Sequence, residues 1–117
     1  MGESGIEING EIAGRLEDME LEGIDSEICF PSLGLWASSF KDPELLLECM
    51  KISNDWAWAT IQEHGQGRMI TTAQVSMLSI DDAVSELERC AEIGFRAVFL
   101  PTTPPSRTPD YNRDDWE

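Results

Sequence analysis

Basic residues are scarce in this sequence of 117 residues, and their scarcity argues against two classes of partner. Eight Lys and Arg stand against 23 Asp and Glu, which gives a net charge of -15. A surface this negative repels the phosphates of nucleic acids and of anionic lipids. No apolar run approaches the roughly 20 residues that a membrane-spanning helix requires. We therefore expect neither a nucleic-acid partner nor a membrane contact.

Cysteine is also scarce. Cys29, Cys49 and Cys90 are odd in number and far apart, and no C-x-x-C pair occurs. Each lies in an apolar stretch, which favours a reduced and buried thiol over a disulfide or a zinc site. The N-terminus is acidic and lacks the basic region and apolar core of a secretory signal. We therefore expect a cytoplasmic protein.

Three apolar, strand-like runs are present, and long helical stretches separate them. The runs cover residues 24–31, 69–77 and 96–100. This alternation is typical of an α/β domain with a parallel sheet. A parallel sheet has to be covered on both faces, and three strands alone form only a small core. Residues 115–117 also resemble the start of a further helix. The sequence therefore predicts a piece of a larger α/β barrel.

The first helical pattern begins at Glu11 and places Ile12, Leu16 and Met19 on one face. Residues 1–10 before it are rich in Gly and Glu, and we expect them to be a flexible lead-in. The predicted domain then covers residues 11–117.

Two further helices have clear start signals. Asp42 is a good N-cap for a helix that we expect to run to about His64. Ser79 and Asp82 form a capping-box pattern for a helix that ends near Ile93. The helix that begins after Asp42 has an apolar stripe, widened on one side, which consists of Leu45, Cys49, Ile52, Trp56 and Ala59 with Leu46, Met50 and Ala57. The helix that begins after Ser79 has a predicted apolar face, which consists of Ile80, Ala83, Val84, Leu87, Cys90 and Ala91.

More specific motifs lie along most of the chain. They occupy residues 15–25 (RLEDMELEGID), 53–56 (SNDW), 67–69 (GRM), 86–100 (with ELERC and IGFR) and 111–116. In this order and spacing they resemble the amidohydrolase-related family. This is the branch of the amidohydrolase superfamily that includes aminocarboxymuconate-semialdehyde decarboxylase. The resemblance covers residues 15–117.

The resemblance implies a fold and a parent chemistry. The fold is an incomplete (β/α)8 TIM barrel, about strands 2 to 4 with their helices, since a complete barrel needs about 250 residues. The parent enzyme is a metal-dependent hydrolase or decarboxylase (a lyase) that acts on a small carboxylated or ring substrate. Its divalent metal, typically zinc, is held by residues of strands 1, 5, 6 and 8. None of these positions falls within this sequence, so no catalytic residue and no metal ligand is carried over, and we expect the chain to be inactive alone.

Candidate site residues follow from the barrel geometry, because the carboxyl ends of barrel strands build the active site. The residues at or just past those ends form a predicted substrate-pocket rim, which consists of Pro31, Trp36, Ser76, Met77, Pro101 and Thr102. Trp36 has two interpretations of equal weight. It shapes the pocket with its loop, or it fills the core.

Three polar residues receive structural interpretations. His64 is the one histidine of the sequence, and we expect a solvated imidazole at a helix end and not a ligand. Asn54 and Asp55 interrupt a helix although both are mediocre helix formers. They form either a surface pair or a hydrogen-bonded brace between the helix and a neighbouring loop. We favour the brace, and neither interpretation makes them catalytic.

An alternative of a different kind follows from the strands that this short sheet leaves uncovered. Exposed apolar strands provide an interface. On this hypothesis the chain is a non-catalytic acidic module that binds a partner or forms a homo-oligomer.

Overall fold

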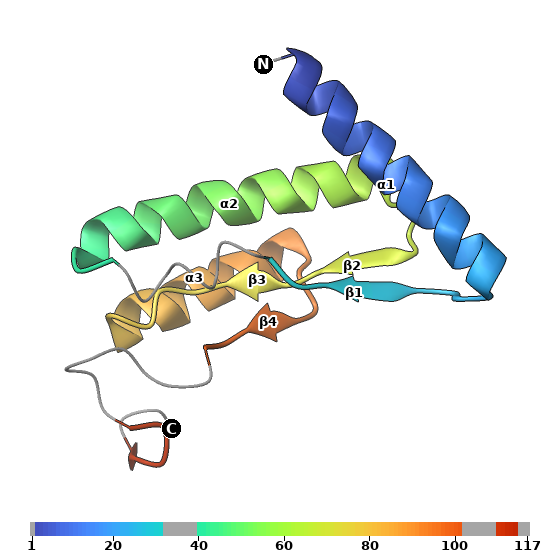
Figure 1. The fold of residues 1–117 in the computed structure, drawn as a ribbon. Helices are drawn as coiled ribbons and strands as arrows, with labels where there is room; N and C mark the ends of the chain where they lie inside the picture. The colour runs from blue at the N-terminus through green and yellow to red at the C-terminus, as the bar shows by residue number, and fades with distance from the viewer. Residues whose placement is uncertain (1, 32–39, 102–109, 115–117) are drawn as a thin grey trace.

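The computed structural model describes residues 2–31, 40–101 and 110–114 of the chain, and Figure 1 shows their arrangement. Helices and strands alternate in these residues. In chain order they are α1 (Gly2–Glu22), β1 (Glu27–Cys29), α2 (Pro43–His64), β2 (Met69–Thr71), β3 (Ala73–Gln74), α3 (Ile80–Ile93) and β4 (Val98–Phe99).

The strands are parallel, as predicted, but each is shorter than its apolar run. Strand β1 pairs with β2, with Cys29 opposite Thr71, and β3 pairs with β4, with Gln74 opposite Phe99. Strands β2 and β3 are separated by Thr72 alone, so they act as one central strand. Its first part pairs with β1 and its second part pairs with β4. The strand order is therefore the chain order, which agrees with consecutive units of a barrel.

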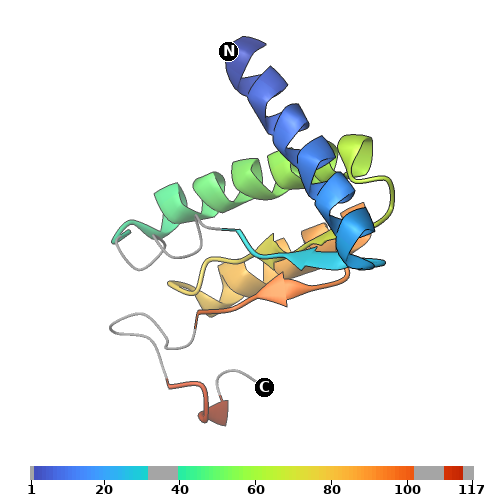
Figure 2. The same cartoon turned by 45° about the vertical axis from the view of Figure 1, so that its right-hand side comes forward.

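The helices α2 and α3 contact each other and the central strand, and α1 crosses α2 near the end of α2 that precedes β2 (Figures 1 and 2). Three apolar clusters fill the contacts. They consist of Ile12, Leu16, Met19 and Met69; of Ala73, Cys90 and Phe95; and of Val75, Met77 and Ala83. The odd-numbered residues of the central strand thus pack against the helices.

The predicted start of the first helix was wrong. We expected the helix to begin at Glu11, but α1 begins at Gly2. Adding a residue to an existing helix adds a hydrogen bond without a new nucleation cost. Once Ile12, Leu16 and Met19 anchor the helix in the core, the backbone of residues 2–10 continues it.

Both predicted N-caps are confirmed. The side chain of Asp42 accepts hydrogen bonds from the backbone N–H groups of Glu44, at 3.0 Å, and Leu45, at 3.4 Å. The hydroxyl of Ser79 accepts one from the N–H of Asp82 at 3.3 Å. These bonds satisfy helix N–H groups that have no partner within the helix. They explain why α2 and α3 begin where the sequence predicts.

The predicted apolar stripe of α2 was partly wrong: Leu46 and Met50, which widen it, are buried, but its central residues are not. Its members Leu45, Ile52 and Trp56 are 53%, 69% and 54% exposed. The buried residues of α2 are Leu46, Met50 and Asn54. Apolar residues lie on both sides of this helix, so periodicity alone does not identify the inner side. The side that contains Asn54 faces inward because its amide binds the central strand, as described below.

The predicted face of α3 was partly wrong for the same reason. Ala83 and Cys90 are buried as expected, but Val84 and Leu87 are exposed. Glu86 is buried instead, with 1% of its surface exposed. The carboxylate of Glu86 is tolerated in the core because both of its oxygens are hydrogen-bonded. The helix α3 is therefore rotated relative to its predicted apolar face.

Replacing Gly94 with alanine is expected to destabilise the protein more than replacing Gly23. Both glycines have positive φ values, +129° and +73°, which cost an alanine about 1–2 kcal/mol. A Cβ atom at Gly94 would also lie 2.7 Å from the ring of Trp58, whereas a Cβ atom at Gly23 meets nothing within 4 Å. Overpacking adds about 1–3 kcal/mol at Gly94. Urea denaturation of both variants measures the difference, and equal losses of stability would contradict it.

Candidate functional site

The carboxyl ends of the parallel strands lie at one edge of the sheet, where the arrowheads point in Figure 1. The structure places four of the predicted rim residues just after strands at this edge: Pro31 after β1, Ser76 and Met77 after β3, and Pro101 after β4. Trp36 and Thr102 lie outside the described residues.

These four residues differ in their surroundings. Met77 is buried with Val75 and Ala83, so it is part of the core in the described structure. The carbonyl of Pro101 accepts a hydrogen bond from the hydroxyl of Tyr111 at 3.1 Å. Pro31 lines a hollow of about 250 Å³ between α1, β1 and α2.

Ser76 is the most informative rim residue. It has no exposed surface, and its hydroxyl has no hydrogen-bond partner among the described residues. The side-chain oxygen of Gln74, two residues earlier, is also buried and is without a partner in the same set. Buried polar atoms are nearly always hydrogen-bonded. The end of the central strand therefore offers two polar atoms to a ligand or an ordered water.

A buried polar network supports this strand from the helix side. The amide of Asn54 donates to the carbonyl of Gln74 at 2.7 Å and accepts from the N–H of Gln74 at 2.8 Å. A side-chain amide has the same donor and acceptor as a peptide group. Asn54 therefore satisfies Gln74 as a residue of a neighbouring strand would. The predicted brace is confirmed, although it joins α2 to a strand and not to a loop.

Glu86 and Arg89 extend the network to α3. Asn54 also donates to Glu86 at 3.0 Å, and the side chain of Glu86 is 0% exposed. Arg89 binds both oxygens of Glu86, at 2.8 and 2.7 Å, and reaches Asp55 of α2 at 2.8 Å. The buried negative charge thus has a bidentate cationic partner, which is the geometry that makes such burial tolerable.

Protonation equilibria in the network reflect these contacts. Burial alone raises the pKa of Glu86, but hydrogen bonds from Arg89, Asn54 and Cys90 outweigh it, so the pKa lies below its ordinary value. The hydrogen bond to Glu86 raises the pKa of Arg89. Burial, together with the nearby Glu86 charge, raises the pKa of the Cys90 thiol to about 12. Cys90 therefore stays protonated near neutral pH and is a poor nucleophile.

Sequence reasoning identified Asn54 and Asp55 but missed the roles of Glu86 and Arg89. Glu86 shares the helix side of Ala83 and Cys90, at spacings of three and four residues. An acidic residue on a buried side, followed one turn later by arginine, is the signal that would have found the pair. The cysteine prediction holds for Cys90, which is buried, and less well for Cys29 and Cys49, which are half-buried free thiols.

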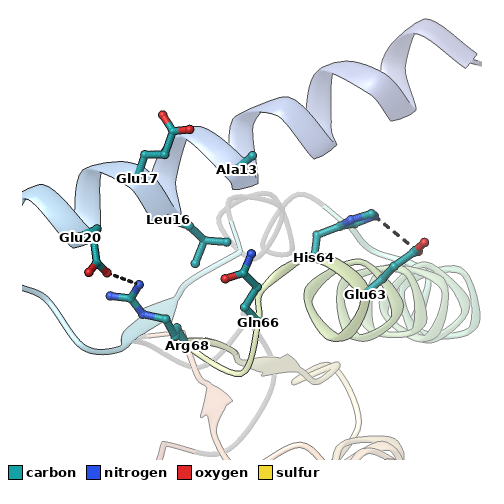
Figure 3. Close-up of a pocket in the computed structure, with 8 residues that line it drawn as sticks. All are labelled: Ala13, Leu16, Glu17, Glu20, Glu63, His64, Gln66 and Arg68. Atoms are coloured by element: carbon teal, nitrogen blue, oxygen red, sulfur yellow. Dashed lines mark hydrogen bonds and ion pairs between the residues drawn. The ribbon is translucent and has the colours of Figure 1, made fainter.

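The opposite edge of the sheet has a polar cavity of about 480 Å³, which Figure 3 shows between α1, the end of α2 and the turn before β2. His64 is the last residue of α2, as predicted, and its ring lies 3.5 Å from the carboxylate of Glu63. Arg68 binds Glu20 at 2.9 Å and the carbonyl of Asp25 at 2.9 Å. These contacts fasten the α1–β1 turn to the start of β2. These contacts lie at the amino ends of the strands. In a (β/α)8 barrel, residues at that face contribute to stability and not to the active site.

Neither a metal centre nor a membrane-spanning helix is found in the described parts of the chain. No three His, Cys, Asp or Glu side chains in residues 2–31, 40–101 and 110–114 are placed to hold a metal ion. The helices of the same residues do not combine the length and apolarity that crossing a bilayer requires. The described residues therefore do not provide the donor set for the divalent metal that the family resemblance implies.

Comparison with known proteins finds similarity in fold to solved structures but no similarity in sequence to a described family. No family model and no curated protein matches the sequence. Among solved structures, the fold is similar to that of 2,6-dihydroxybenzoate decarboxylase from Rhizobium, with a TM-score of 0.72 and 21% sequence identity. The similarity covers 87% of this chain and 32% of the decarboxylase. The chain thus spans about a third of that protein, and at this identity the likeness concerns the fold alone.

Replacing Asn54 with leucine is expected to destabilise the protein by about 3 kcal/mol or more. The change leaves the N–H and carbonyl of Gln74 buried without their partner, and each such group costs about 1–3 kcal/mol. Gln62→Leu, at an exposed position of the same helix, is the matched control. Chemical denaturation measures stability, and amide hydrogen exchange of Gln74 measures the local effect. Similar stability of the two variants would show that the brace contributes little.

The pH dependence of stability is expected to change in Glu86→Gln. Because the folded-state pKa of Glu86 is below its ordinary value of 4.5, its stabilising effect is present above that value and is lost as the pH falls through the folded-state pKa. The variant is therefore less stable than wild type at pH 7, and the difference shrinks below about pH 4.5. Denaturation at several pH values measures this, with Glu92→Gln as the control for removal of an exposed charge. A difference that is constant with pH contradicts the assignment.

Proposed function

We propose that this chain is a segment of a metal-dependent hydrolase or decarboxylase of the amidohydrolase superfamily. It corresponds to about strands 2 to 4 of a (β/α)8 barrel, in the branch that includes aminocarboxymuconate-semialdehyde decarboxylase. The observation that carries the proposal is the match of its consecutive parallel β–α units to 32% of a decarboxylase structure. The ordered motifs of the sequence agree with it. The comparison lends no support to the alternative of a non-catalytic acidic module.

A contact across the sheet supports a curved barrel wall. The rings of Phe30, just after β1, and Phe99, in β4, lie with centroids 5.9 Å apart. The central strand runs between these two strands, so their side chains meet over it. In a (β/α)8 barrel, side chains from alternate strands share one interior layer. Phe30 and Phe99 belong to the segments on either side of the central strand, and their rings are in contact, as expected of two residues in one interior layer.

Exposed apolar residues support further β–α units in the complete enzyme. On the strands, Ile28 and Phe30 are 52% and 66% exposed. On α3, Val84 and Leu87 are exposed as well. A barrel helix packs between the helix before it and the helix after it. A unit that follows β4 would provide the second neighbour of α3, and the closed barrel interior would cover Phe30.

The substrate site of this proposal lies at the carboxyl edge of the strands. There Pro31, Ser76, Met77 and Pro101, with Trp36 and Thr102, form the proposed rim. Among the described residues, the buried hydroxyl of Ser76 and the side-chain oxygen of Gln74 have no partner. The hydroxyl could donate to a small carboxylated or ring substrate, and the Gln74 oxygen could accept from an ordered water. The divalent metal, zinc in the simplest case, would be held by residues of other strands. A cytoplasmic location agrees with the free thiols.

A chimera tests the proposal. The matching third of the Rhizobium decarboxylase is replaced by this chain, and the product is assayed for cooperative unfolding, bound divalent metal and decarboxylation of 2,6-dihydroxybenzoate. We expect a folded chimera that binds metal, because the segment completes the barrel wall. The same chimera with Asn54→Leu is the control and is expected to be less stable. A chimera that folds cooperatively without metal, or that aggregates while the unmodified chain is stable, contradicts the proposal.

A further inference from the structure

We draw no further inference here: the strongest candidate, the polar cavity between α1, the end of α2 and the turn before β2, is lined by exposed carboxylates, two of which, Glu20 and Glu63, are already paired with Arg68 and His64, and nothing in the described structure shows what ligand would occupy it.

Discussion

The position of the central strand depends on one side-chain amide. Asn54 binds both backbone polar groups of Gln74, at 2.7 and 2.8 Å, and so satisfies a strand residue that has no strand neighbour on that side in the described structure. Buried backbone groups require such partners. The same contact sets the rotation of α2. With Asn54 inside, Leu46 and Met50 face the core, and Ile52 and Trp56 face outward.

Three arginines of this acidic chain, Arg15, Arg68 and Arg89, lie at joints between its elements. Arg89 neutralises the buried Glu86 and also reaches Asp55, which joins α3 to α2. Arg68 ties the start of β2 to the α1–β1 turn. Arg15 of α1 pairs with a carboxylate of β1. In each case one guanidinium connects segments distant in sequence, which suits its several donors in fixed directions. The many acids that lack such partners lie mainly on exposed helix surfaces.

Two faces of this arrangement differ in their chemistry. The carboxyl edge of the strands has the Ser76 hydroxyl, which lacks a hydrogen-bond partner among the described residues, and the neighbouring rings of Phe30 and Phe99. The outer side of α2 has the exposed apolar residues Leu45, Ile52 and Trp56. The polar network between them lies among α2, α3 and the central strand. It supports the strand edge, because Asn54 of this network binds the backbone of Gln74.

The sequence by itself determined the order of the helices and strands, the parallel class of the sheet and the starts of α2 and α3. These features depend on local signals: apolar periodicity, and the caps Asp42 and Ser79, whose hydrogen bonds span only a few residues. Only the tertiary structure decided which sides of α2 and α3 are buried. Both helices have apolar residues on more than one side, and the choice follows from contacts across 20 and 32 residues of sequence, those of Asn54 with Gln74 and with Glu86. Periodicity contains no information on such long-range pairing, so the exposed apolar side of α2 and the buried Glu86 are visible only in the folded chain.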